Sequence, residues 1–386
     1  MRDVVKRMIC VGAVAAAGVM VWMSPMGAGA VQQPGGGGGD DRVVLITLDG
    51  ARTEEMFGGL DEAILRSTLK PDQKLEEHPT YKRFWAPTPE ARRLKLLPFF
   101  WGTLMAKHGS IAGDPALGSA VRLTNKHWFS YPGYSEILVG EAHDDTIKSN
   151  DPIRNPNPTV LEGIRERLNL PRARVATFSS WNAFNAIAEH TEGATLINAG
   201  MEPLADDASG AAAATAELRA LDAAQSEVQP PWNDVRFDYF TVKLALAHLA
   251  SARPRVLYLS VTETDDWAHD GRYDRLLDAY ARTDRYLEML WTWLQEQPDY
   301  RGRTHILIST DHGRGHTPAD WRDHGAKIVG AENTWIAFVS PTMSARGPWK
   351  QHAPIGTNQI AATLARWVGV DWNAMRPAAG KPIQQP

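Results

Sequence analysis

Short apolar runs alternate with longer amphipathic stretches along most of the chain. The runs predict buried strands at residues 42–48, 174–179, 255–261, 304–309 and 335–339. Apolar residues at helical spacing predict helices that include residues 160–168, 237–250, 272–297 and 357–368. Unbroken apolar strands separated by amphipathic helices are typical of an α/β fold whose mostly parallel sheet is covered by helices on both faces.

Two segments follow this alternation less well. Residues 70–128 are rich in proline and aromatic residues, and residues 199–235 hold an alanine-rich piece followed by QPPWNDV. We predict that both are insertions near the functional site of one catalytic domain, residues 42–372. A glycine-rich linker, VQQPGGGGGDD at residues 31–41, precedes this domain, and residues 373–386 are predicted to be a flexible tail.

The first residues of the chain predict export. Basic residues at positions 2, 6 and 7 precede an uncharged apolar run at residues 9–23, and Ala28-Gly29-Ala30 supplies small residues for cleavage. This order is that of a secretory signal peptide, predicted at residues 1–30. An uncleaved anchor is the alternative, but a membrane span needs roughly 20 apolar residues. We therefore expect a periplasmic or secreted protein without a stable membrane anchor.

Composition narrows the classes of function. The formal net charge is −4, and loss of the predicted signal peptide makes the chain more acidic, so binding to a nucleic-acid backbone is not expected. The single cysteine, Cys10, lies within the predicted signal peptide. The mature chain is therefore expected to have no disulfide bond, thiolate ligand or thiol nucleophile.

Carboxylates and imidazoles follow three of the predicted strands. Taken singly, each has an ordinary structural interpretation: a turn, a solvated helix start or a surface histidine. Taken together, they form a set of candidate metal ligands: Asp49, Asp265, His269, Asp311, His312 and His324.

This set requires cations if it converges. The carboxyl ends of parallel strands meet at one edge of a sheet, so separate loops can bring the side chains together. Three carboxylates within ~4 Å of one another repel by roughly 4 kcal/mol per pair at an effective dielectric near 20. Aspartate and histidine suit zinc and also accept manganese or magnesium. The sequence therefore predicts divalent cations, most favourably Zn²⁺.

A hydroxyl nucleophile is expected beside the cations. HWFSYPGYSEILVG offers Ser130 in a Pro/Gly turn before an apolar helical run. A serine next to a divalent cation can be held as an alkoxide, by the logic that lowers the pKa of metal-bound water to about 7. Three aspartates and one alkoxide carry four negative charges, which two divalent cations balance. The alternative is that Ser130 is an ordinary helix N-cap; Thr53 is the next hydroxyl candidate.

In order and spacing, these motifs resemble the alkaline phosphatase superfamily, especially its nucleotide pyrophosphatase/phosphodiesterase branch. There an early strand ends in Asp-Gly, as LITLDG does here, and a T-F-P-N-H turn holds the nucleophile, similar to S-Y-P-G-Y. The branch's E-P-D-x-x-G-H, S-D-H-G and G-D-H-G resemble ETDDWAH, STDHG and RDHG. The resemblance covers roughly residues 42–370. Sulfatases and cofactor-independent phosphoglycerate mutases share this metal core.

The resemblance implies a role for each residue. One metal falls to Asp265, His269 and His324, and the other to Asp49, Asp311, His312 and Ser130. Asn150 stands one residue out of register with a family asparagine that contacts the substrate phosphoryl group. Arg314 and His316 are further candidates for substrate contacts. His352 is a rival to His324. We prefer His324 because the His-Gly that it forms with the next residue, and the apolar strand after it, both match the family.

Departures from the family pattern limit the expected activity. Gly133 replaces the Asn of phosphodiesterases, and Tyr134 stands where sulfatases carry Arg. No segment is long enough for the second domain of the mutases. We expect an exported two-metal hydrolase that cleaves small phosphate monoesters or diesters through Ser130. The alternatives are a sulfatase-like or phosphonate hydrolase, a phosphoglyceromutase-like phosphotransferase, and a non-catalytic metal-containing binding protein. The oligomeric state stays open.

Overall fold

The computed structural model describes residues 39–205 and 215–384, which belong to one compact unit of the chain. The predicted signal peptide and most of the predicted linker lie outside these residues. Within the described ranges, no helix is both long and apolar enough to span a membrane.

The central sheet confirms the predicted fold class. Its strand order is β10-β2-β9-β7-β1-β6-β4-β5, and the five strands from β7 to β5 are parallel, whereas β9 is antiparallel to both β7 and β2. The strands are β1 Arg42–Leu48, β2 Gly109–Ala112, β4 Val175–Ser179, β5 Leu196–Ala199, β6 Val256–Val261, β7 Thr304–Ser309, β9 Ile336–Val339 and β10 Gly347–Pro348. All five predicted strands are present, within one residue of the expected bounds.

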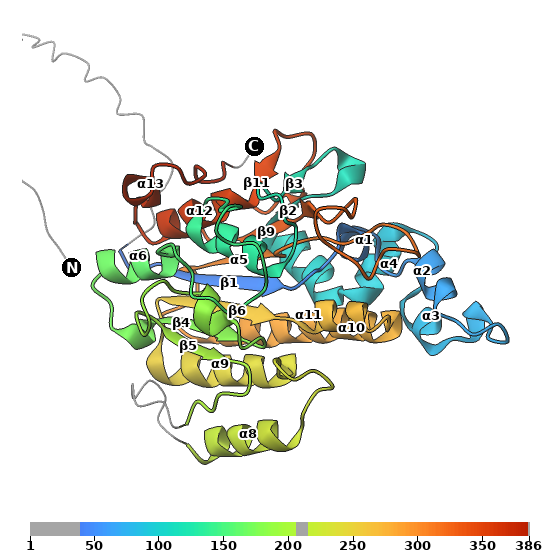
Figure 1. Ribbon diagram of the computed structural model, residues 1–386, viewed down its shortest axis with the longest axis horizontal. Helices are drawn as coiled ribbons and strands as arrows, with labels where there is room; N and C mark the ends of the chain where they lie inside the picture. The colour runs from blue at the N-terminus through green and yellow to red at the C-terminus, as the bar shows by residue number, and fades with distance from the viewer. Residues whose placement is uncertain (1–38, 206–214, 385–386) are drawn as a thin grey trace, which may run out of the picture. The chain divides into compact units, whose positions relative to one another are not determined.

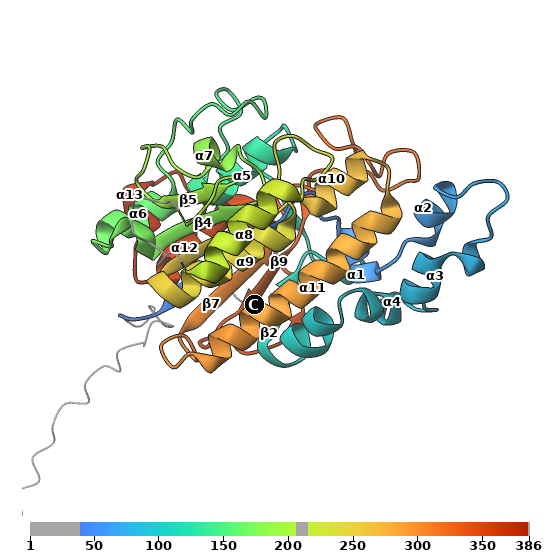
Figure 2. The same ribbon diagram turned by 90° about the horizontal axis from the view of Figure 1, so that it is seen from below.

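Helices cover both faces of the sheet, as Figures 1 and 2 show. Val43 and Leu45 of β1 pack into the core shared with α5, α6 and α12, while Val44 and Ile46 pack toward α9 and α11. The helices are α1 Thr53–Gly58, α2 Glu62–Ser67, α3 Pro79–Phe84, α4 Pro89–Leu96, α5 Ser130–Val139, α6 Val160–Arg167, α7 Phe184–Ile187, α8 Ala216–Glu227, α9 Asp238–Ala252, α10 Glu263–His269, α11 Tyr273–Glu296, α12 Ile360–Trp367 and α13 Trp372–Met375. Because alternate side chains of β1 are buried on opposite faces of the sheet, its apolar run is continuous.

The segment at residues 70–128 differs from its expected role as an insertion. It supplies β2 to the central sheet, together with α3, α4 and a π-helical stretch, Phe100–His108. It also supplies β3 (Val121–Arg122) of a small second sheet with β8 (Asn333–Thr334) and β11 (Ile355–Gly356). The strand β2 reads GSIA, too short and too poor in large apolar residues to stand out in the sequence.

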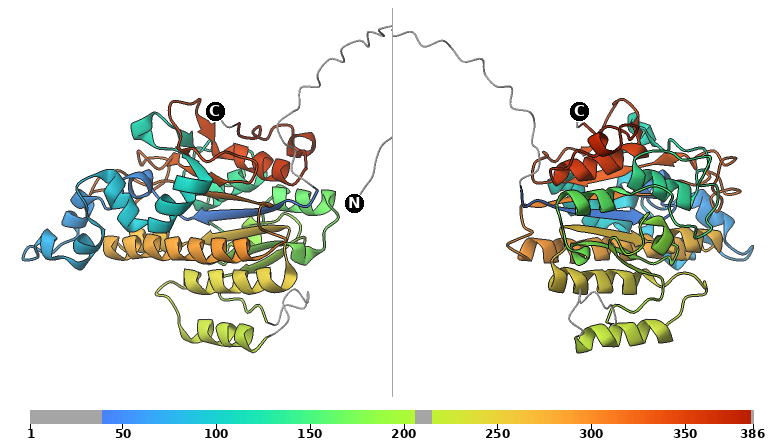
Figure 3. Two further views of the ribbon diagram at one scale, coloured as in Figure 1. Left: turned by 180° about the vertical axis from the view of Figure 1, so that it is seen from behind. Right: turned by 60° about the vertical axis from the view of Figure 1, so that its left-hand side comes forward.

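In the segment at residues 199–235, α8 lies outside α9, on the side away from the sheet (Figure 3).

Residues 373–384 belong to the segment that was expected to be a flexible tail. However, the Gly380 N–H donates to the Gly140 carbonyl and the Ile383 N–H donates to Thr363 Oγ1. The tail is therefore packed on the domain as far as residue 384.

Candidate metal centre

Three neighbouring strands bring candidate ligands to one edge of the sheet. Asp49 directly follows β1, Asp311 lies just beyond β7, and Asp265 lies in α10, which follows β6. Both β6 and β7 pair in parallel with β1. Because parallel strands direct their carboxyl ends to the same edge, three carboxylates far apart in sequence meet there.

The first cluster consists of Asp49, Asp311 and His312, all buried. His312 Nε2 is 3.4 Å from Asp49 Oδ1 and 3.5 Å from Asp311 Oδ2. These two carboxylate oxygens are buried and accept no hydrogen bond from the described residues. His312 Nδ1 donates to the Gly313 carbonyl at 2.8 Å, so Nε2 is the atom left for a ligand. The donor set and its unpaired oxygens fit a divalent cation.

Neighbouring groups hold the remaining oxygens of this cluster. Tyr134 OH donates to Asp49 Oδ2 at 2.8 Å, and the Gly50 N–H donates to Asp311 Oδ1 at 3.0 Å. Each carboxylate thus has one oxygen fixed by the protein and one facing the centre. The sequence interpretation did not assign Tyr134 this role. Its position four residues after Ser130, on the same face of a helix, is the signal that could have identified it.

Ser130 lies against the first cluster. It is the first residue of α5, buried, and its Oγ is 3.4 Å from His312 Nε2. The N-cap of α5 is Phe129, so the alternative interpretation of Ser130 as an N-cap does not describe its position. Its hydroxyl is therefore placed beside the candidate cation ligands.

The second cluster is the predicted set Asp265, His269 and His324; of these, Asp265 and His324 have donor atoms that lie, together with one of His312, within 4.8 Å of one another. His269 Nε2 is 3.2 Å from Asp265 Oδ2 and 3.0 Å from His324 Nε2. His324 Nε2 is 4.0 Å from Asp265 Oδ1, and the His324 ring lies 4.1 Å from the ring of His312, so the two clusters adjoin. The rival histidine, His352, is elsewhere: its Nε2 is 2.6 Å from Ser119 Oγ.

Burial and neighbouring charges shift the pKa values of three groups in this centre. Burial and then the Asp49 charge raise the pKa of Asp311 to about 8. Burial opposes a charge on His312, yet the Asp311 and Asp49 carboxylates raise its pKa to about 9. Burial and then the charge on His312 hold the pKa of His324 far below its ordinary value. Without a cation, protons take its place among the carboxylates; divalent metals would supply that charge instead.

Two of the three expected substrate contacts, Arg314 and His316, bond carboxylates of the protein. The Arg314 guanidinium donates to Asp265 Oδ1 and to the Arg322 carbonyl, and burial lowers the pKa of Arg314 to about 9, which keeps it charged at neutral pH. His316 Nδ1 bonds the Glu54 carboxylate, and this bond raises the pKa of His316.

The third expected contact, Asn150, lines the cavity that opens onto the metal clusters. Its Oδ1 accepts the Tyr131 N–H of α5 at 2.9 Å. The cavity has a volume of about 460 Å³. Its lining residues are Asp49, Ser130, Asn150, Pro152, Trp181, Asn182, Ala183, Asp234, Val235, Thr262, Asp265, Asp266 and His269. Apart from the candidate metal ligands, its carboxylates are Asp234 and Asp266, and burial raises the pKa of Asp266 well above its ordinary value; the set contains neither lysine nor arginine.

One wall of this cavity joins Trp181, which was not identified from the sequence, to the segment at residues 199–235, which was expected near the site. Trp181, which follows β4, donates from Nε1 to Asp234 Oδ2 at 3.0 Å, and its backbone forms a bridge with Val235. The segment at residues 199–235 therefore reaches the site through its last residues.

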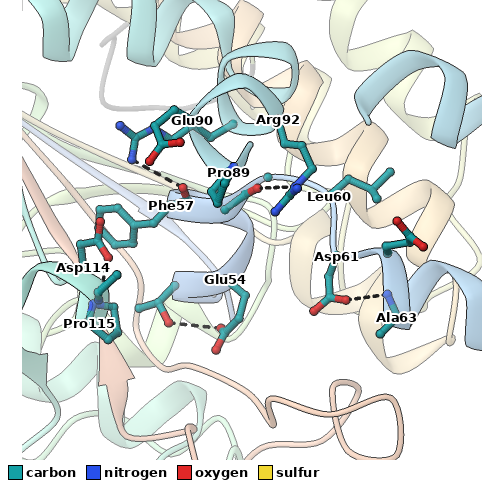
Figure 4. A pocket seen from close by; sticks show the side chains of 16 residues that line it. Glu54, Phe57, Leu60, Asp61, Ala63, Pro89, Glu90, Arg92, Asp114 and Pro115 are labelled. Carbon is teal, nitrogen blue, oxygen red and sulfur yellow. Dashed lines mark hydrogen bonds between the residues drawn. The ribbon is translucent and has the colours of Figure 1, made fainter. Parts of the chain in front are cut away.

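A second cavity, of about 560 Å³, lies beside α1 and α4 and is drawn in Figure 4. Glu54, Phe57, Leu60, Glu90 and Arg92 are among its lining residues. It is lined by none of the candidate metal ligands. Thr53, the fallback nucleophile, lines this cavity rather than the metal clusters, and its Oγ1 donates to Glu54. We therefore keep Ser130 as the candidate nucleophile.

Comparison with known proteins gives a family and a fold. A sequence model of the type I phosphodiesterase / nucleotide pyrophosphatase family matches residues 99–369. No curated protein matches the chain. Among solved structures, wild-type alkaline phosphatase PafA superposes with a TM-score of 0.56 at 11% identity, covering 88% of this chain and 98% of PafA.

Two further solved structures have similar folds. An alkaline phosphatase superfamily protein from Vibrio parahaemolyticus has a TM-score of 0.52 at 11% identity, covering 91% of this chain and 71% of its own. The lipoteichoic acid synthase LtaP from Listeria monocytogenes has a TM-score of 0.50 at 8% identity, covering 86% of this chain and 72% of its own.

Proposed function

The chain belongs to the type I phosphodiesterase / nucleotide pyrophosphatase family, and we propose that it is an exported hydrolase of small phosphate esters that binds two divalent metals and acts through Ser130. Family membership makes it a hydrolase that acts on ester bonds. The metals, the nucleophile and the cellular location are the parts that we add.

One observation carries the proposal. Asp49 Oδ1, Asp311 Oδ2 and Ser130 Oγ all lie within 3.5 Å of His312 Nε2. Two of these atoms are buried acceptors without a hydrogen bond from the described residues. A purely structural cluster would pair such oxygens with donors, because an unpaired buried acceptor costs about 1–3 kcal/mol. A cation beside a hydroxyl accounts for all four atoms.

The residues present define the steps. Ser130 loses its proton to solvent, and its Oγ attacks phosphorus as the bond from phosphorus to the leaving-group oxygen breaks. The leaving oxygen takes a proton from water. The oxygen of a second water then bonds phosphorus as the Oγ–P bond breaks, and a proton of that water goes to Oγ, which restores Ser130 and releases phosphate, or a phosphate monoester when the substrate is a diester. When bound, the two divalent cations supply positive charge that stabilises the serine alkoxide and the leaving oxygen.

The first cation would be held by Asp49, Asp311, His312 and Ser130, and the second by Asp265, His269 and His324. This donor set suits Zn²⁺ best, with Mn²⁺ or Mg²⁺ as alternatives.

We propose Asn150 as a substrate contact because it lines the cavity beside Ser130. The cavity has room for the leaving group of a small monoester or diester. The proposal therefore includes hydrolysis of phosphate monoesters and of phosphate diesters.

Sulfate ester hydrolysis is less well supported. Sulfatases carry Arg at the position of Tyr134, which here is buried and bonds Asp49. Export rests on the signal-peptide pattern at residues 1–30, and a periplasmic or secreted location follows from it.

The proposal is tested with purified protein loaded with Zn²⁺, Mn²⁺ or Mg²⁺ after chelation. Chromogenic phosphate monoesters and diesters and a sulfate ester serve as substrates, with metal content measured on the same samples. We expect phosphate ester cleavage that disappears with the metal and with Ser130→Ala. Sulfate cleavage with formylglycine at residue 130 would support the sulfatase alternative. Bound metal without any hydrolysis would support a binding protein.

A further inference from the structure

Arg314 places a permanent cation at the edge of the metal centre. Its side chain has no exposed surface. The guanidinium donates to Asp265 Oδ1, to the Asp265 carbonyl at 3.3 Å and to the Arg322 carbonyl. A Cβ placed on Gly50 would be 2.8 Å from Arg314 Nε and 2.6 Å from Asp265 Oδ1. The guanidinium therefore lies directly over the residue that follows Asp49, and the absence of a side chain at Gly50 makes room for it.

The carboxylate that Arg314 contacts is also a candidate metal ligand. Asp265 Oδ1 bonds the guanidinium and lies 3.7 Å from His312 Nε2, while Oδ2 lies 3.2 Å from His269 Nε2. One carboxylate therefore serves both a fixed cation and any metal held by the second cluster.

The two clusters differ in charge as a result. Asp49 and Asp311 give the first cluster two negative charges, each with an oxygen that no described residue satisfies. In the second cluster, two neutral histidines accompany Asp265, and the nearby guanidinium cancels its single charge. A divalent cation is attracted less strongly by the second cluster, whose net charge with the guanidinium is zero, than by the first cluster with its two negative charges. It is also repelled by the guanidinium that contacts the same carboxylate.

We propose that Arg314 weakens the second metal site, so that the protein holds one divalent cation tightly and exchanges the other readily. This inference rests on the proposed two-metal function. It assigns Arg314 as a positioning residue that sets metal affinity through Asp265, where the sequence suggested a substrate contact. The phosphoryl group of a substrate brings negative charge to the centre, so substrate binding would strengthen the second site.

The test measures stepwise Zn²⁺ affinity by competition with a chromophoric chelator, with metal content checked after dialysis. Arg314→Met removes the charge while keeping an unbranched stem of similar reach. Arg322→Met is the matched control, because it removes an exposed arginine close in sequence whose side chain does not contact Asp265. We expect Arg314→Met to tighten the weaker step by about tenfold or more, because it removes the repulsion between a guanidinium and a divalent cation that share one carboxylate. The control should stay within about threefold of wild type. The tighter step should change less than the weaker one, since Arg314 interacts with the Asp49 charge but bonds the Asp265 carboxylate.

A weaker step that is unchanged or loosened in Arg314→Met would overturn the inference, since the arginine would then merely orient Asp265. If the wild type and the variants are folded but none of them binds Zn²⁺ at either step, the proposed function itself fails.

If Arg314→Met does not fold, Arg314→Gln is measured in the same way, and two variants of the candidate ligands that keep Arg314 supply an independent test. His269→Ala should abolish only the weaker step and Asp311→Asn only the tighter one. The reverse assignment would overturn the inference.

Discussion

Adding a single methyl group at Gly133 should lower the rate of catalysis strongly while lowering the free energy of unfolding only slightly. Gly133 lies in α5, one turn after Ser130, and a Cβ built there would be 2.2 Å from the Asp311 carbonyl oxygen and 3.3 Å from Asp311 Cβ. Ordinary contacts of a Cβ begin near 3.4 Å. Gly133→Ala therefore requires a movement of roughly 1 Å between α5 and the loop after β7.

Both sides of this contact belong to the candidate site, so either way of relaxing misplaces a group that we propose to act in catalysis. If α5 moves, Ser130 leaves its position; if the loop moves, Asp311 does. A displacement of about 1 Å can cost about 100-fold in rate. Overpacking costs about 1–3 kcal/mol of folding free energy, of which the better helix propensity of alanine returns up to about 1 kcal/mol. We expect kcat to fall about 100-fold with a loss of folding free energy of no more than about 2 kcal/mol.

The assay compares kcat on a chromogenic phosphate ester with the free energy of unfolding in urea. Gly102→Ala is the matched control, because its Cβ would meet only Leu94 Cδ1, at 3.5 Å. The control should keep kcat within about twofold and leave stability unchanged or slightly raised. A Gly133→Ala enzyme with wild-type kcat and metal content would refute the reasoning, because α5 and Asp311 would then separate without consequence for the site.

Three more predictions follow from the same geometry. His324→Ala should lower metal affinity by about tenfold or more, whereas His352→Ala should not, because its Nε2 bonds Ser119; equal losses of bound metal would show that His324 is not a ligand. In the metal-free protein, the pKa values of Asp311 (about 8) and His312 (about 9) lie above their ordinary values, so stability present at low pH is lost as pH rises through these values. The melting temperature of chelator-treated protein should therefore fall as pH rises, through Asp311 between its ordinary pKa of 3.8 and about 8 and through His312 between 6.5 and about 9, while that of metal-loaded protein does not; parallel pH profiles would contradict this. Since Asp234 lines the cavity outside the candidate metal ligands, Asp234→Asn should raise kcat/KM severalfold for esters with an anionic leaving group relative to neutral ones; an unchanged ratio would show that the leaving group does not pass Asp234.

The sequence predicts the sheet well because a buried parallel strand requires a continuous run of apolar residues, which is visible in the sequence. A continuous apolar run such as VVLITL can only be covered on both faces, and the register between β1 and its neighbours brings their ends to one edge. Asp49, Asp265 and Asp311 could therefore be grouped before any coordinates were known. Strand β2 could not be predicted in this way, because GSIA is short and made mostly of small residues.

Contacts made across the fold could not be predicted in this way. The close approach of Gly133 to Asp311 depends on the distance between a helix and a loop nearly 180 residues apart in sequence. The pairing of Arg314 with Asp265 depends on how two loops face each other, and sequence spacing alone suggested a substrate contact instead. Motif order identifies which residues meet, whereas packing decides which of them bond to each other.

Rapid acid quenching during turnover tests the central claim most directly. Metal-loaded enzyme is mixed with a phosphate ester, quenched within the first turnovers and digested, and the peptide that contains Ser130 is weighed by mass spectrometry. The account predicts a phosphoryl group on this serine, absent from chelator-treated enzyme and from Ser130→Ala. Full metal-dependent turnover by Ser130→Ala, with no phosphorylated peptide in the wild type, would contradict it.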